Sequence, residues 1–181
     1  MCEMIVLYKM LGGLLPAYWL AALCHEWGHC VCGMMCGARL CVLRVGAFIW
    51  TGGHIKPWVQ LKRYHTPGQC LLWCENEKAL CAAAVGGCLC NFVSGVISFF
   101  LLAKLEEKHA LRPNGVGGML LFDFALLSVL MSLINILPLS WGSDGARLIR
   151  LTGDVQLRRD MCEDMRNACF LVENGAAEEV I

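Results

Sequence analysis

The chain has few charged residues. Asp, Glu, Lys and Arg make up 17% of its 181 residues, whereas a soluble domain usually carries about 25%. Acidic and basic residues are equal in number, so no nucleic-acid partner is expected. Hydrophobic residues make up 57% of the chain and the mean hydropathy is +0.57. This composition is typical of a membrane protein, and the length fits one domain.

The chain also lacks any C-x-x-C pair, although it contains 13 cysteines. The absence argues against a thiolate zinc knuckle and against a thioredoxin-like redox motif. Many of the cysteines lie in apolar segments, where cysteine behaves as a small hydrophobic residue. We therefore expect free packing thiols, not a disulfide framework. No cleavable signal peptide is expected either, because no basic region and small-residue cleavage site flank the first apolar run.

Three segments are long and apolar enough to cross a bilayer, at about residues 11–36, 79–103 and 116–139. Between the first two, residues 37–50 are rich in Val, Leu, Ile and aromatics around Gly46, which predicts a strand or short hairpin near the membrane surface. The predicted fold is an α-helical integral membrane protein with a three-helix core and a membrane-associated β-hairpin. Residues 1–151 would form this core, residues 61–73 an interfacial loop, and residues 152–181 a short cytosolic tail with a helix.

Orientation follows from the positive-inside rule. Eleven of the 15 Lys and Arg residues lie between the first two spans or after the third. With three spans these two regions share one side, so we expect a multi-pass protein with its N-terminus outside and its C-terminus cytosolic. Its small size suits a bacterial cell membrane.

His25-Glu26-Trp27-Gly28-His29 is an H-E-x-x-H sequence inside the first apolar segment. On a helix, residues four apart share a face, so both imidazoles can reach one metal ion, and Glu26 can deprotonate a metal-bound water. Between residues 10 and 36 these are the only Asp, Glu, Lys, Arg or His residues. Such groups in an apolar span are costly and usually mark function.

A metal with two histidine ligands needs a third, and Asp144 is the best candidate. It follows the third span after Pro138 and the glycine-containing turn at residues 140–145. Pro138 would end the helix and the glycines would let the backbone return toward the membrane. The alternative for Asp144 is an ordinary helix cap.

Other candidate ligands are weaker. The longer H-E-x-x-H-x-x-G-x-x-H pattern fails at Cys32 and Met35. Acidic residues just before the second span suit the first turn of a helix, and two histidines between the first two spans suit a surface loop. Asp123, inside the third span, would lie about 30 Å from Asp144 on a continuous helix, and its role stays open. The acidic residues before the second span are Glu75 and Glu77, and the two loop histidines are His54 and His65.

Ala83, Gly87, Asn91 and Gly95 recur every four residues in the second span. Small residues on one face allow close helix packing. Asn91 differs from the others because an amide within lipid needs hydrogen-bond partners. It could orient a substrate backbone or stabilise an oxyanion.

Together these motifs resemble the site-2 protease family of intramembrane zinc metalloproteases. The resemblance covers residues 11–151 and combines His25-Glu26-x-x-His29 with two later motifs. Gly87-x-x-x-Asn91 is similar to the family's G-P-x-x-N, with Cys88 in place of Pro. Asn135-x-x-Pro138 followed by Asp144-Gly145 is similar to its N-x-x-P…D-G, with Ser143 where Leu is common. The short interval between the last two spans implies a minimal core member without a PDZ or CBS domain.

The resemblance implies one zinc ion bound by His25, His29 and Asp144, with Glu26 as general base and proton donor. It implies that Asn91 and Asn135 orient the substrate. The expected activity is endopeptidase cleavage of membrane-associated peptides or proteins near the cytosolic face, with the lipid bilayer and, if the chain self-associates, a homo-oligomer as further partners. We also hypothesise that a substrate strand pairs with residues 41–48. The alternative is a non-catalytic membrane scaffold that binds metal or substrate.

Overall fold

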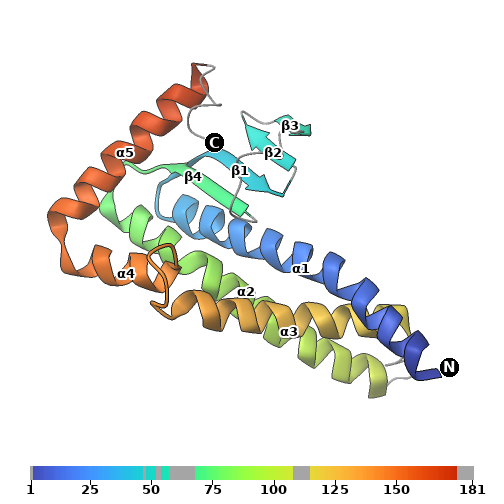
Figure 1. The fold of residues 1–181 in the computed structure, drawn as a ribbon. Coiled ribbons are helices and arrows are strands. Elements are labelled where there is room, and N and C mark those ends of the chain that lie inside the picture. The colour runs from blue at the N-terminus through green and yellow to red at the C-terminus, as the bar shows by residue number, and fades with distance from the viewer. Residues whose placement is uncertain (1, 47, 52–53, 58–67, 108–114, 175–181) are drawn as a thin grey trace.

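The computed structural model describes residues 2–46, 48–51, 54–57, 68–107 and 115–174, with the side chains of residues 2–11 and 54–57 left aside. Helices and strands follow one another along this part of the chain (Figure 1) in the order α1 Cys2–Met35, β1 Arg39–Val45, β2 Phe48–Thr51, β3 His54–Pro57, β4 Gly68–Trp73, α2 Glu77–Glu107, α3 Val116–Ile136, α4 Asp144–Gly153 and α5 Val155–Glu173.

Three long helices run side by side, and each of α1, α2 and α3 contacts the other two (Figure 1). Helices are therefore present at all three predicted spans. α2 and α3 are long and apolar enough to cross a membrane. α1 covers the first predicted span up to Met35, but over its described residues it does not reach the apolarity of these two helices.

α3 ends at Ile136, short of the predicted end of the span at about residue 139 and just before Pro138, which was predicted to end the helix. Leu137 follows the last helical residue and has φ −77° and ψ 134°. This is the extended conformation that a proline imposes on the residue before it, because the ring of Pro138 crowds the α conformation of Leu137. The break after Ile136 frees the chain to turn before α4 begins.

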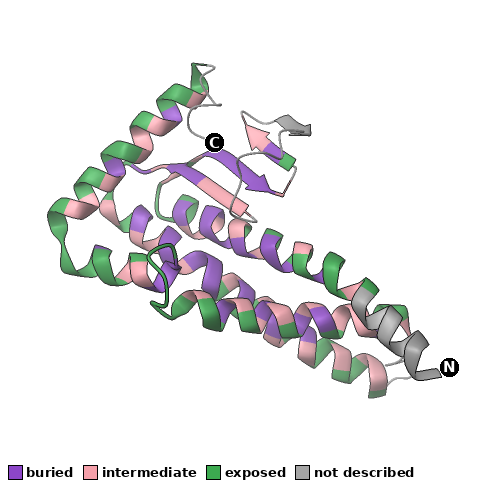
Figure 2. Cartoon of the chain, viewed as in Figure 1, coloured by how far each residue is buried: buried purple, intermediate pink, exposed green. Residues whose placement is uncertain are grey.

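Many large apolar side chains on the bundle are exposed, and Figure 2 shows exposed residues along all three helices. An extensive exposed apolar surface marks contact with lipid or with another apolar partner. On α2 and α3 the exposed side chains are Leu89, Phe92, Val93, Ile97, Phe100, Leu101, Val116, Phe122, Leu126, Leu130, Leu133, Ile134 and Ile136.

α1 and α2 cross at a pair of glycines. A Cβ on Gly28 would collide with the carbonyl oxygen of Gly86, and a Cβ on Gly86 would collide with that of Gly28. The two backbones therefore meet directly, as small residues permit at helix crossings. This close approach brings the His25–His29 turn of α1 against α2.

β1 and β2 form the predicted hairpin. They pair antiparallel from Val42 opposite Thr51 to Val45 opposite Phe48. Gly46, in the turn, has φ +55°, and a Cβ there would collide with the ring of Trp19 on α1. Glycine suits this position because it tolerates positive φ and leaves room for the indole.

The hairpin is part of a larger sheet than the sequence predicted. The strand order is β3-β2-β1-β4, and β4 occupies residues 68–73 of the predicted interfacial loop. That part of the loop prediction is wrong, because Gly68–Trp73 pairs antiparallel with β1. The hypothesis that a substrate strand pairs with β1 is also wrong, since β2 and β4 already occupy both edges of β1.

The two faces of β4 have different partners. Gly68, Cys70 and Leu72 face α1, where they meet Glu26, Cys30 and Gly33 respectively. Leu71 and Trp73 belong to the cluster that packs against α5. Two strand residues span about 6.8 Å and one helical turn about 5.4 Å, so β4 can follow α1 for several contacts and fix the sheet to the bundle.

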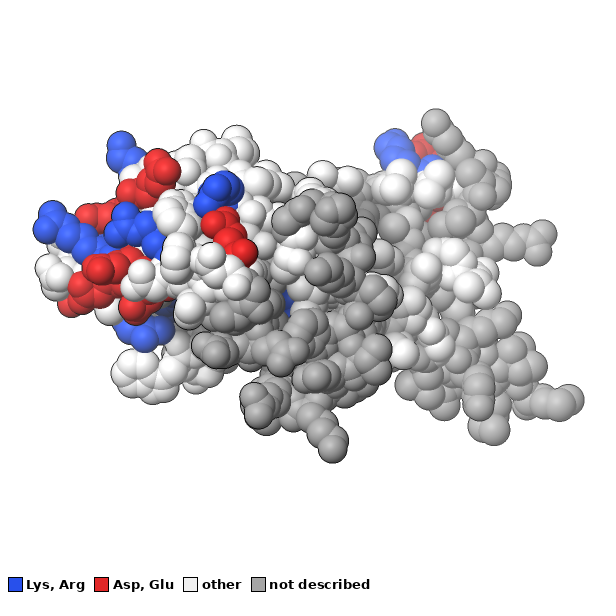
Figure 3. Space-filling model, turned by 90° about the horizontal axis from the view of Figure 1, so that it is seen from above, with Lys and Arg blue, Asp and Glu red and all other residues white. Residues whose placement is uncertain are grey.

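The C-terminal helix predicted in the tail is α5, and it packs against the sheet. Cys162 and Cys169 of α5 are buried in two apolar clusters with residues of β1, β4 and α2. Charged side chains gather at this end of the molecule, over α5 (Figure 3). The twelve cysteines whose side chains are described carry free thiols, in agreement with the prediction of packing cysteines.

Candidate metal centre

The helical geometry of α1 brings the two histidines together. His25 and His29 lie one turn apart and are buried, with 3.1 Å between their Nε2 atoms. Their rings meet edge to face at 4.7 Å between centroids. The i, i+4 spacing of the motif therefore places both donor atoms at one point, as predicted.

Asp144 reaches the same point from α4. Its Oδ2 lies 3.1 Å from His25 Nε2 and 3.5 Å from His29 Nε2. These atoms form a buried group that could hold a metal ion, with all three within 4.8 Å of one another. The structure thus brings together the three ligands that the sequence predicted.

Asp144 is free for this role because another residue caps α4. Ser143 is the N-cap, and its Oγ accepts a hydrogen bond from Ala146 N at 3.3 Å. The alternative prediction of Asp144 as the cap is therefore wrong. A serine before the aspartate satisfies the helix terminus, and the carboxylate can turn toward the histidines.

The turn that returns Asp144 to the bundle depends on Gly145. A Cβ at this position would collide with the backbone of Ile136, at the end of α3. The start of α4 therefore packs directly on the end of α3, which a larger residue would prevent. This contact sets the depth of Asp144 relative to α1.

Residues of α2 contact the two imidazole rings. His29 Nδ1 lies 2.6 Å from the carbonyl oxygen of Ala83 and donates to it. Its Nε2 is then left as the metal-binding nitrogen, which is the usual arrangement of a ligating histidine. A Cβ on Gly87 would lie 2.6 Å from His29 Cε1 and 2.8 Å from His25 Cε1, so only glycine leaves room for both rings.

The Asp144 carboxyl is held in its ionised form. Burial acts to raise its pKa, but the hydrogen bond from His25 and the charge of His29 outweigh burial and hold the pKa below its ordinary range. An ionised carboxylate is the form that binds metal.

The distances between the three donor atoms fit a zinc-like ion. Ligand atoms about 2.1 Å from a tetrahedral metal lie about 3.4 Å apart. The three measured separations of 3.1, 3.1 and 3.5 Å are close to this value. Two imidazole nitrogens and one carboxylate oxygen also leave the fourth tetrahedral position open.

Glu26 follows His25 on α1, interacts electrostatically with His25 and Asp144, and is half-buried. On its other side is the start of β4, where a Cβ on Gly68 would collide with the Glu26 carboxyl group. Sequence reasoning missed Gly68, because a contact between a strand and a helix more than one element away leaves no local pattern.

The other predicted site residues lie outside the three-ligand group. Asn91 is fully buried in α2, and neither its amide oxygen nor its nitrogen has a hydrogen-bond partner among the described residues. Asn135 is half-buried in the last turn of α3. Asp123 is buried in α3 near Gly13 of α1, where a Cβ would lie 2.8 Å from its Oδ2.

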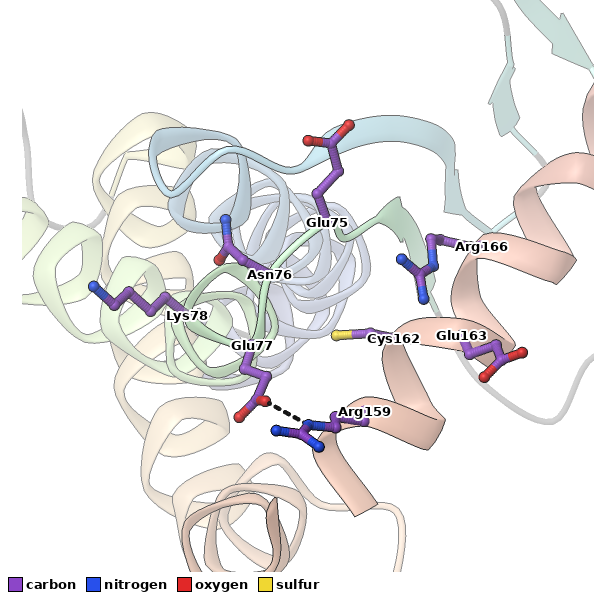
Figure 4. A pocket seen from close by; sticks show the side chains of 8 residues that line it. All are labelled: Glu75, Asn76, Glu77, Lys78, Arg159, Cys162, Glu163 and Arg166. Atoms are coloured by element: carbon purple, nitrogen blue, oxygen red, sulfur yellow. Dashed lines mark ion pairs between the residues drawn. The ribbon is translucent and has the colours of Figure 1, made fainter. Parts of the chain in front are cut away.

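The competing acidic residues belong to a separate surface pocket of about 750 Å³, which Figure 4 shows between the start of α2 and α5. Glu75 and Glu77 line it, and Glu77 pairs with Arg158 at 2.6 Å and with Arg159 at 3.5 Å. They are therefore not metal ligands of the histidine pair. His65 and the side chain of His54 lie outside the described residues.

No family model, curated protein or solved structure matches the chain. The case for a function therefore rests on the residues and on the geometry of this site.

Proposed function

We propose that the chain is an intramembrane zinc endopeptidase similar to the site-2 proteases. The observation that carries the proposal is the buried group of His25, His29 and Asp144 beside Glu26. A metal carrier needs the ligands alone, whereas a hydrolase also needs a base next to an open metal position. Glu26 supplies that base.

His25, His29 and Asp144 would hold the ion, and a bound zinc ion supplies Lewis-acid chemistry to a peptide carbonyl and to water. Glu26 takes a proton from the attacking water and delivers it to the leaving amine nitrogen. Ala83 keeps the proton of His29 on Nδ1, at 2.6 Å. Asn91, with a buried and unpaired amide in the described structure, is suited to orient the substrate backbone, and Asn135 is a second candidate for this task.

β4 offers an edge on which an extended substrate could lie. In the described part of the chain β4 pairs with β1 only, and its first residue, Gly68, lies against Glu26. A peptide strand added to this edge would run toward the catalytic carboxylate. Strand addition also unwinds a substrate helix, which exposes its peptide bonds to attack.

A membrane setting is part of the proposal. Two apolar helices of spanning length and the exposed apolar residues of the bundle support it. The charged α5 end belongs on the cytosolic side by the positive-inside rule, with the N-terminus outside. A reporter fusion tests this directly, since a C-terminal green fluorescent protein should fluoresce and a C-terminal alkaline phosphatase should be inactive.

The decisive experiment compares wild type with Glu26→Gln on peptides from membrane proteins. Glu26→Gln should bind one zinc ion per chain and show no cleavage above background, because the amide cannot accept the proton. Wild-type rates in the variant would refute the base, and the absence of cleavage in both would favour a non-catalytic metal-binding or substrate-binding scaffold.

A further inference from the structure

The Cys88 thiol contacts the candidate metal site through Asp144. Its Sγ donates a hydrogen bond to Asp144 Oδ2 at 3.4 Å, and the residue is only 3% exposed. Oδ2 is the same carboxylate oxygen that faces the two histidine nitrogens. The thiol therefore touches the atom that would bind the metal.

This hydrogen bond gains importance when a metal is bound. The other neighbours of Asp144 Oδ2 among the described side chains are His25 Nε2 and His29 Nε2. Both nitrogens would then direct their lone pairs at the metal and could no longer donate to Asp144. Of the described side chains that contact the Asp144 carboxylate, only Cys88 would still donate to it.

Cys88 is itself held in place from α3. Ser132 Oγ donates to the carbonyl oxygen of Cys88 at 2.8 Å. The preceding residue, Gly87, packs on both imidazole rings. One short stretch of α2 therefore contacts all three ligands and is fixed by α3, while Asp144 comes from a separate helix beyond an exposed turn.

The geometry also argues against Cys88 as a fourth ligand. His25, His29 and Asp144 form a group with all donor atoms within 4.8 Å, and Cys88 is not a member of it. The ligands of one tetrahedral zinc ion lie about 3.4–3.8 Å apart. Cys88 therefore acts on the ligand and leaves the open metal position free.

We propose that the Cys88 thiol is a positioning residue that orients the Asp144 carboxylate toward the metal. The inference rests on the proposed metal site and needs no particular substrate. Hydrogen bonds to ligating carboxylates commonly change metal affinity by about 10–100-fold. The family that this chain resembles usually has a proline at the position of Cys88, and proline offers no donor. The hydrogen bond from this position to Asp144 is therefore a property of this chain.

The test is metal titration of the purified full chain in detergent, with Zn²⁺ and Co²⁺ as probes. Cys88→Ala should weaken metal binding by about 10–100-fold. Cys88→Ser should restore most of the affinity, because a hydroxyl also donates. The matched control is Cys90→Ala, on the same helix and half-buried, which should bind like wild type. Unchanged affinity in Cys88→Ala would overturn the proposal.

A second measurement serves if Cys88→Ala does not fold. The S–H stretching band of Cys88 is isolated by subtracting the infrared spectrum of Cys88→Ser from that of wild type. The band should lie at the low frequency of a donating thiol and move up in Asp144→Ala. An unmoved band, or a thiolate-to-metal charge-transfer band in the Co²⁺ form, would refute a positioning role.

The outcomes separate this inference from the proposed function. If wild type binds metal through Asp144 but cleaves nothing, the protease proposal fails, and the comparison of Cys88→Ala with Cys88→Ser still decides the role of the thiol. If Asp144→Ala binds metal as tightly as wild type, the ligand assignment and the positioning role fail together.

Discussion

Gly68, the first residue of β4, lies so close to Glu26 of α1 that a Cβ would collide with the Glu26 carboxyl group. The backbone of a strand therefore lies against the proposed base. We expect Gly68→Val to displace Glu26 and to reduce cleavage at least 100-fold, since small misplacements of a catalytic group can cost that much. Zinc binding should persist, because the three atoms nearest to a Cβ at this position all belong to Glu26 and none to a ligand.

A glycine in open space provides the control for that substitution. A Cβ on Gly153 would meet no atom within 4 Å, so Gly153→Val should cleave peptides at close to the wild-type rate. Parallel assays of cleavage and zinc content show whether Gly68→Val affects the base alone. A Gly68→Val variant with normal kcat/KM would show that Glu26 tolerates displacement.

Metal should stabilise the folded chain through the three ligands. A ligand at 100 times its Kd contributes about 2.7 kcal/mol to the free energy of unfolding. Zinc addition should therefore raise the Tm of chelator-treated wild type and leave that of His25→Ala or Asp144→Ala almost unchanged. Thermal unfolding followed by intrinsic fluorescence gives the comparison, and an equal zinc-dependent shift in Asp144→Ala would remove Asp144 from the ligand set.

The crossing of α1 and α2 should be sensitive to volume at Gly86. A Cβ there would collide with the carbonyl oxygen of Gly28, which is backbone and cannot move aside easily. Gly86→Ala should separate the helices and cost about 1–3 kcal/mol in the free energy of unfolding. Gly12→Ala is the matched control on α1, because a Cβ at Gly12 meets nothing within 4 Å. Equal denaturation midpoints for the two variants would count against a direct backbone contact.

The ion pairs of Glu77 should hold α5 against the start of α2. Arg158 and Arg159 both reach its carboxylate, and Arg158 also donates to the carbonyl oxygen of Leu151. Glu77→Gln should increase hydrogen exchange in α5 and leave zinc affinity unchanged, because none of the three proposed ligands lines the pocket that holds this pair. Glu75 lines the same pocket and forms no ion pair with the described residues, so Glu75→Gln should exchange like wild type. Slower or equal exchange in Glu77→Gln would contradict the docking role.

The local parts of the site could be read from the sequence. His25 and His29 are one turn apart in any helix, and the apolar run around them predicts that helix. Pro138 predicts the end of α3, because its ring restricts the residue before it. The hairpin turn at Gly46 also follows from local residue preferences. Each of these features depends on the backbone preferences of neighbouring residues.

The tertiary structure decided what depends on contacts between distant segments. Ser143 takes the capping role, and Asp144 is left to face the histidines, only because α4 packs on the end of α3 at Gly145. β1 is an internal strand, which excludes it as the docking edge, because β4 returns to pair with it after a long interval. Gly68 and Cys88 gained their roles in the same way, since a collision with Glu26 or a hydrogen bond to Asp144 arises only when separate elements pack together. Local preferences fix the spacing of the histidines, and long-range packing fixes what surrounds them.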